Sequence, residues 1–110
     1  MKDYYSLFVQ ECSKLCRISD FSDPKRVHLH NESMKRINHL KEDLIKYGRS
    51  DILYELMRYK DEMVQMNAAA ICLQLGIYID EALIVLSRIE KETTDKSIQF
   101  TCKTLLRNSL

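Results

Sequence analysis

The stretch DEMVQMNAAAICLQLG, residues 61–76, is apolar on nearly every side when it is wound as a helix. A helix that is apolar all round is usually central to a helical domain, with neighbours on more than one side. Asp61 is a favourable N-cap, and Gly76 is favourable as the left-handed residue after the last turn. The small alanines at 68–70 would let neighbouring helices approach closely. This stretch predicts a central helix over Glu62–Leu75 in an all-α protein.

The composition favours the same class. Only two of the 110 residues are glycine and one is proline, whereas an all-β protein needs many tight turns. The chain is 45% hydrophobic and 30% charged, which is typical of a globular protein. A chain of this length should bury about 60–70% of its unfolded surface. We therefore expect a single helical domain, 1–110, that folds without metal or disulfides.

Apolar residues at spacings of three and four predict further helices outward from the central one. They are expected over about 2–17, 24–47, 51–59, 81–92 and 96–108. Asp23 precedes Pro24 and is expected to cap the second helix, which Asn31 could break into two pieces. Gly48 is expected to end that helix in the left-handed region. Asp80 and Asp95 are expected to cap the last two helices.

The second half of the chain repeats itself. Asp61–Ala68 aligns with Asp95–Cys102 at an offset of 34 residues, and the aspartate begins the second helix of a pair in both copies. The first helices of the two pairs align at an offset of 30 residues, Leu53 with Leu83. A period in this range is typical of stacked helical hairpins. Residues 50–108 are therefore expected to form two hairpin repeats, after N-terminal helices in 1–48.

One run within the first repeat carries a more specific resemblance. It reads Asp61-x-x-Val64-Gln65-x-x-Ala68-Ala69-x-x-Cys72-x-x-Leu75-Gly76 and resembles the second helix of a HEAT-type repeat. In that family Gln65 is usually an arginine, and the repeat that begins at Asp95 lacks the final glycine. The resemblance covers roughly residues 50–108 and implies HEAT-like stacked helical hairpins, about six helices in one right-handed array. The whole chain also resembles small bacterial helical domains, some of which are immunity proteins encoded beside toxin genes.

Charge and targeting signals are weak. Seventeen basic residues face sixteen acidic ones, a net charge of +1, whereas nucleic-acid-binding domains usually carry a clear basic excess. The first residues lack the apolar run of a signal peptide, and no apolar stretch is long enough to span a bilayer. The four cysteines show no disulfide-scaffold pattern and are expected to be reduced thiols. We expect a cytoplasmic protein that does not enter a membrane.

A search for reactive groups finds one metal candidate. Cys12 and Cys16 share a helix face, and His28 and His30 could approach them. Structural zinc normally uses closer knuckle spacings, so small core cysteines are the favoured interpretation. All three histidines lie in one helical region, and no glycine loop could cradle a phosphate or an oxyanion. We expect no enzyme activity, no catalytic residue, no cofactor and no metal.

The candidate partner-binding residues are tyrosines and acidic residues near helix ends in the repeat region. They are Asp51, Tyr54, Glu55, Tyr59, Tyr78, Asp80 and Glu81. Tyrosine buries a large area at little entropic cost and is a common interface anchor. The acidic residues lie near the start of the first helix in each of the two predicted hairpins.

These observations predict a non-enzymatic protein-binding module. Its preferred specific form is a cytoplasmic immunity or antitoxin protein that binds and blocks a cognate toxin domain. A general helical-repeat adaptor is an alternative, and so is an RNA-binding repeat that uses Arg49, Arg58, Tyr59 and Lys60. The last repeat has no polar capping helix, so a homodimer through that end is a further alternative to a monomer.

Overall fold

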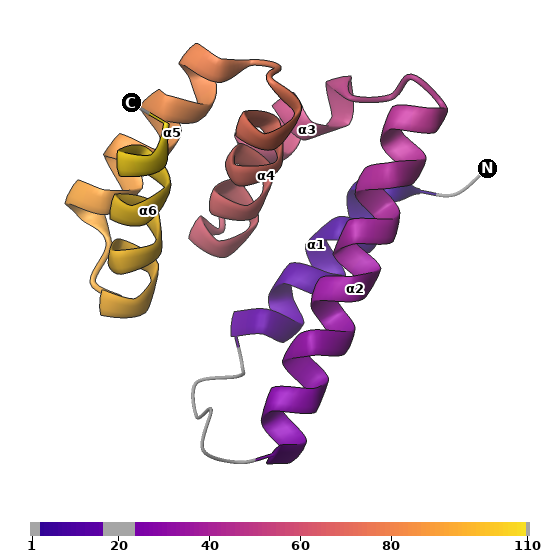
Figure 1. Cartoon of the computed structure of the whole chain (residues 1–110), viewed down its shortest axis with the longest axis horizontal. Coiled ribbons are helices and arrows are strands. Elements are labelled where there is room, and N and C mark those ends of the chain that lie inside the picture. The colour runs from indigo at the N-terminus through magenta and orange to yellow at the C-terminus, as the bar shows by residue number, and fades with distance from the viewer. Residues whose placement is uncertain (1–2, 17–23, 110) are drawn as a thin grey trace. The chain divides into compact units, whose positions relative to one another are not determined.

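The computed structural model describes residues 3–16 and 24–109 of the chain. Within these ranges it contains six α-helices and no strand, which confirms the all-α class (Figure 1). The helices are α1 (Tyr4–Cys16), α2 (Pro24–Lys46), α3 (Asp51–Leu56), α4 (Glu62–Leu75), α5 (Ile79–Glu92) and α6 (Lys96–Asn108). The predicted cap Asp23 lies outside the described residues. None of the described helices combines the length and the apolar character of a membrane span.

The chain falls into two compact units, which we call the N-terminal unit (Met1–Ile52) and the C-terminal unit (Leu53–Leu110). The division lies inside α3, close to the boundary expected between the N-terminal helices and the hairpin repeats. Each unit has its own buried residues.

The N-terminal unit consists chiefly of α1 packed along α2 (Figure 1). Phe8 of α1 and Leu44 of α2 are fully buried. Asp3 caps α1, because its carboxylate accepts a 3.1 Å hydrogen bond from the Ser6 backbone N–H and a 2.7 Å bond from the Ser6 hydroxyl. These bonds hold the pKa of Asp3 below its usual value. This cap was not predicted from the sequence.

The second helix runs without interruption through Asn31, so the predicted alternative of a break there is wrong. Asn31 is exposed, and an asparagine on a solvated helix face costs at most about 0.7 kcal/mol relative to alanine. The helix ends as predicted before Gly48, which has a φ of 66°. Ile45 is 51% exposed, because its neighbour Leu44 occupies the buried stripe.

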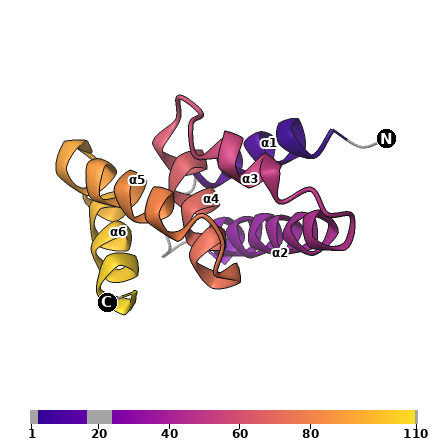
Figure 2. The same ribbon diagram turned by 90° about the horizontal axis from the view of Figure 1, so that it is seen from above.

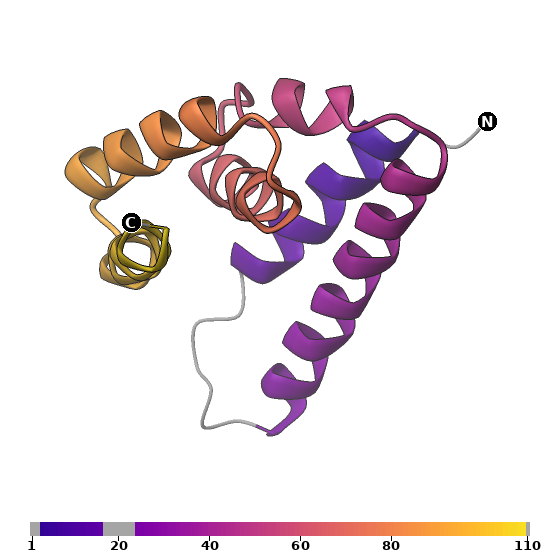
Figure 3. The ribbon, with the colours of Figure 1, turned by 45° about the horizontal axis from the view of Figure 1, so that its top comes forward.

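In the C-terminal unit, α4 packs against α5 and α6, and α5 also packs against α6. Figures 2 and 3 show α5 crossing both of the other helices, while the axes of α4 and α6 point in similar directions. The bounds of α4 are those predicted. Ala68, Ala69 and Cys72 are fully buried, which agrees with the central place expected for this helix.

The capping aspartates make the same pair of hydrogen bonds in both predicted repeats. The Asp61 carboxylate accepts from the backbone N–H groups of the second and third residues of α4, at 2.8 and 3.3 Å. Asp95 does the same at the start of α6, at 2.9 and 3.2 Å. Both predicted caps are confirmed, as is the left-handed Gly76, with a φ of 70°.

A glutamine follows each cap by four residues and donates to a backbone carbonyl of the preceding segment. Gln65 Nε2 donates to the carbonyl of Tyr59, in the turn before α4. Gln99 Nε2 donates to the carbonyl of Glu90, near the end of α5, at 3.1 Å. Each glutamine therefore ties the second helix of a pair to the chain that precedes it.

Two predicted boundaries are wrong. The helix α5 begins at Ile79 with Tyr78 at its N-cap position, so Asp80 lies in the first turn and does not cap the helix. The reason is the left-handed conformation of Tyr78, which turns the chain into the helix two residues early. The helix α3 ends at Leu56 rather than at Tyr59, because tighter i to i+3 hydrogen bonds replace the helical pattern there.

Candidate partner-binding surface

The structure brings two of the predicted site residues into direct contact. The rings of Tyr54, on α3, and Tyr78, at the start of α5, lie with their centroids 5.2 Å apart and their planes tilted by 50°. This separation and tilt fall in the range that aromatic pairs prefer. Both residues are half-buried, so part of the pair remains accessible to solvent. The pair therefore presents an aromatic surface whose position is fixed by the fold.

The backbone of Tyr78 is unusual. Its φ of 48° and ψ of 39° lie in the left-handed region, and it is the only described residue other than glycine with a positive φ. A side chain at such a position costs roughly 1 kcal/mol or more, and glycine or asparagine would be cheaper. Its side chain makes no capping hydrogen bond, although its carbonyl accepts from Ala82 at 2.9 Å. The conformation places the aromatic ring against Tyr54.

Exposed carboxylates adjoin the tyrosine pair. Glu55 follows Tyr54 in α3, and Asp80 and Glu81 lie in the first turn of α5, just after Tyr78. None of these three carboxylates forms an ion pair with another residue in the described part of the chain. Asp80 and Glu81 are also favourably placed for the dipole of α5. We call these three residues with the two tyrosines the acidic-aromatic surface.

The remaining two predicted site residues are placed differently. Asp51 begins α3 but belongs to the N-terminal unit, and its carboxylate lies 3.2 Å from Nε of Arg49. Its charge is therefore partly neutralised within the chain. Tyr59 is half-buried, and its carbonyl accepts the hydrogen bond from Gln65. We do not include these two residues in the acidic-aromatic surface.

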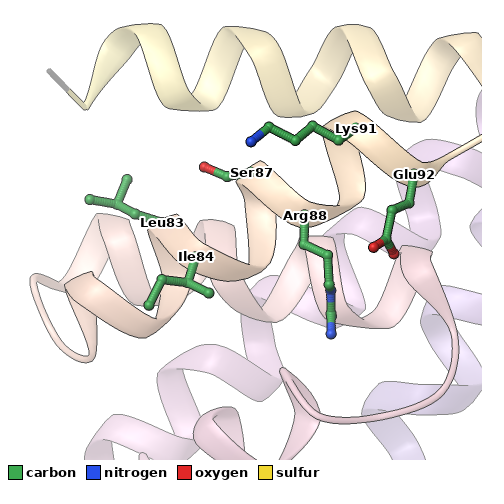
Figure 4. A pocket seen from close by; sticks show the side chains of 6 residues that line it. All are labelled: Leu83, Ile84, Ser87, Arg88, Lys91 and Glu92. Atoms are coloured by element: carbon green, nitrogen blue, oxygen red, sulfur yellow. The ribbon is translucent and has the colours of Figure 1, made fainter.

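A groove that the sequence analysis missed lies on the outer face of α5 (Figure 4). It has a volume of about 440 Å³ and is lined by Leu83, Ile84, Ser87, Arg88, Lys91 and Glu92. Ile84 is 68% exposed, which is unusual for an isoleucine. The inward stripe of α5 contains Ala82, Leu86 and Ile89, and Ile84 falls outside it. The signal for this groove in the sequence was Ile84, an apolar residue outside the inward stripe of the helix.

A second hollow, of about 270 Å³, adjoins this groove where α5 ends and α4 begins. Arg88 and Glu92 line both. Nη2 of Arg88 donates to Oε1 of Gln65 at 3.1 Å, so the guanidinium is positioned from α4 as well as from α5. The Thr93 hydroxyl, which directly follows α5, donates a 3.3 Å hydrogen bond to Oε1 of Glu62 at the start of α4. The groove therefore lies where hydrogen bonds join α5 to α4.

The predicted metal candidates and two buried cysteines can be placed in the structure. Within residues 3–16 and 24–109, no three His, Cys, Asp or Glu side chains lie close enough together to hold a metal ion. Of the metal candidates, Cys12 is buried and His28 is exposed, while the side chain of Cys16 lies outside what the structure describes. Burial raises the pKa values of the Cys72 and Cys102 thiols to about 11. At neutral pH these two thiols stay protonated, which is the wrong state for a nucleophile.

No family model matches this chain, and no curated protein and no solved structure matches it either.

Proposed function

We propose that this chain is a non-enzymatic protein-binding module that recognises its partner through the acidic-aromatic surface. The observation that carries the proposal is the contact between Tyr54 and Tyr78, maintained by the strained backbone of Tyr78. Tyrosines supply much of the binding energy at protein interfaces. A ring pair that is already held in place loses less conformational freedom on binding, which favours affinity.

The charge of the surface indicates the chemistry of the partner. Three exposed carboxylates, Glu55, Asp80 and Glu81, stand beside the tyrosines without ion-pair partners among the described residues. Complementary potentials steer association and suppress wrong partners. A partner with lysines or arginines around an apolar contact therefore fits best.

The narrower form of the proposal is an immunity or antitoxin protein. It rests on the resemblance to small bacterial HEAT-like domains and on the acidic character of this surface. A local acidic surface can block a basic cleft of a toxin even though the net charge of the chain is only +1. The general adaptor is the broader version of the same function.

A pull-down with tagged protein from lysate of the source organism tests the proposal. We expect one protein to be retained in stoichiometric amount, to survive nuclease treatment and to be lost when Glu55→Lys and Glu81→Lys are combined. The matched control combines Glu42→Lys and Glu92→Lys, which makes the same charge change at exposed positions off this surface. The control should retain the partner.

Three outcomes would count against the proposal. Retention of nothing but the protein itself would remove the partner. Equal loss from both double variants would show that net charge, not this surface, governs binding. Recovery of nucleic acid that disappears on nuclease treatment, with binding that falls steeply as salt rises, would favour the RNA-binding alternative.

A further inference from the structure

A row of three exposed residues runs along the outer face of α5. Asp80, Ile84 and Arg88 follow one another at intervals of four, so they lie on one side of the helix. The row reads acidic, apolar, basic, and Ile84 at its centre is 68% exposed. Figure 4 shows Ile84 and Arg88 pointing to the same side of α5. Neither Asp80 nor Arg88 forms an ion pair with any other described residue.

The row is complementary to itself when it is reversed. If a second α5 lies antiparallel across the first with the two Ile84 side chains in contact, each Asp80 faces the Arg88 of the other copy. The acidic and basic positions lie about 12 Å apart along the helix, so both ion pairs form at once on either side of the apolar centre. Residues that exchange partners in this way are the mark of a two-fold interface.

We propose that the outer face of α5 is a contact between two copies of this chain in a symmetric dimer. Ile84 packs against Ile84 of the second copy, and Asp80 pairs with Arg88 of the second copy on both sides. This inference shares Asp80 with the acidic-aromatic surface but does not rest on the proposed function, because it depends on the outer face of α5 and not on the tyrosine pair.

Charge selects this arrangement over the others. A parallel pairing about Ile84 would place Asp80 against Asp80 and Arg88 against Arg88, and like charges in contact are repulsive. Sliding the antiparallel pairing by one turn in this direction would bring Asp80 opposite Glu92 and leave Arg88 facing Ile84. Arg88 can make the intermolecular pair while keeping its bond to Gln65, because a guanidinium has five N–H donors.

The contact is expected to be weak. The 14 residues of α5 span about 21 Å, and a contact made mainly by one such helix lies below about 1,200 Å², in the range of transient interfaces. The dimer should therefore form with rising concentration and loosen with rising salt, since its ion pairs lie at the edge of the contact.

Sedimentation equilibrium of the full chain, from about 10 µM to about 1 mM at low salt, tests the proposal. The wild-type chain should pass from monomer to dimer and no further. The variants Asp80→Arg and Arg88→Asp each create two like-charge contacts in their own homodimer and should weaken association about tenfold or more. An equimolar mixture of the two variants restores both opposite-charge pairs and should dimerise at least as well as the wild type.

The mixture separates the interface from effects on folding. Both substituted positions are exposed, and circular dichroism of each variant should show unchanged helical content. Ile84→Asp provides a second route, because it places two like charges at the centre and should abolish the dimer. A wild-type chain that stays monomeric throughout the concentration range, or a mixture that associates no better than the single variants, would overturn the proposal. Assembly beyond dimers would overturn it as well.

Discussion

The two units hold their helices together in different ways. In the N-terminal unit a largely buried carboxylate joins α1 to α2: Glu11 accepts a 2.9 Å hydrogen bond from Arg36 Nε and a 3.1 Å bond from Lys14 Nζ. In the C-terminal unit the side-chain amides of Gln65 and Gln99 donate to backbone carbonyls of the preceding segment, beside charged contacts such as that of Lys103 with Glu90 at 3.8 Å. The Glu11 contact depends on ionisation, whereas the two amide contacts do not.

The pKa of Glu11 expresses this difference. Burial disfavours the charged form, but the hydrogen bonds from Arg36 and Lys14 outweigh burial and leave the pKa below its usual value. The N-terminal unit should therefore lose stability in acid before the C-terminal unit does. The comparison also shows that a charged contact between distant residues and a repeated local device can serve the same purpose.

The largest expected effects come from truncating the core of each unit. Phe8 and Leu86 are both fully buried, so Phe8→Ala should cost about 3–5 kcal/mol and Leu86→Ala about 2–5 kcal/mol of unfolding free energy. Urea denaturation measures both. Residue-resolved amide exchange then sharpens the comparison, because each variant should lose protection most in its own unit. A cost below about 1 kcal/mol in either variant would contradict the packing described for that unit.

The second effect tests the contact of the Glu11 carboxylate with Arg36 and Lys14. Glu11→Gln removes the ionised acceptor of Arg36 and Lys14 and should cost about 1–3 kcal/mol near neutral pH. The folded-state pKa of Glu11 is lowered, so its contribution is present above the unfolded pKa and is lost as pH falls through the folded pKa. The stability gap between variant and wild type should close on acidification. Glu92→Gln, at an exposed position, serves as the control, and a gap that persisted in acid would argue against an ionic origin.

The third effect tests whether the repeated caps are equivalent. Asp61→Ala and Asp95→Ala should each cost about 0.5–2 kcal/mol, because each leaves two backbone N–H groups of a helix start without their side-chain acceptor. Asparagine at either position should retain most of the stability. Thermal unfolding measures all four variants. A large cost at one cap with none at the other would show that the two sites are not equivalent.

The fourth effect appears only in alkali. The raised pKa values of Cys72 and Cys102 mean that the unfolded chain ionises these thiols first, so stability falls as pH rises above 9. Each thiol should account for about 1 kcal/mol of this loss by pH 10. Replacing both with alanine should flatten the alkaline slope relative to the wild type, although it lowers stability at every pH. An unchanged slope would mean that the thiols are not buried as described.

Local signals in the sequence predicted the C-terminal unit best. The bounds of α4 follow from Asp61 and Gly76, residues that fix a helix end by their own chemistry. The start of α5 was predicted wrongly because Tyr78, not Asp80, occupies its N-cap position. The left-handed conformation of Tyr78 accompanies its contact with Tyr54, a residue far away in the sequence. No local pattern announces such a contact. HEAT-like stacking of the two hairpins stays a prediction.

The candidate site was predicted in part for the same reason. Spacing alone placed tyrosines and acids near helix ends, and the structure brings Tyr54 and Tyr78 together. Spacing could not show that Arg49 neutralises Asp51. The ion pair joins residues two positions apart and depends on the conformation of the turn between α2 and α3. The bond between Glu11 and Arg36 joins residues 25 apart and left no periodic trace in the sequence. The inward stripe of α5 predicts its buried residues and says nothing of Ile84, which lies outside that stripe.

Hydrogen exchange of the chain with and without its captured partner tests most directly whether the acidic-aromatic surface binds a protein. The first backbone N–H groups of α5 have no helical acceptor, so those of Asp80 and Glu81 should exchange quickly in the free chain. We expect the partner to slow exchange around Tyr54–Glu55 and Tyr78–Glu81, at concentrations where the chain alone is monomeric. Protection confined to the N-terminal unit, or no protection at all, would contradict it.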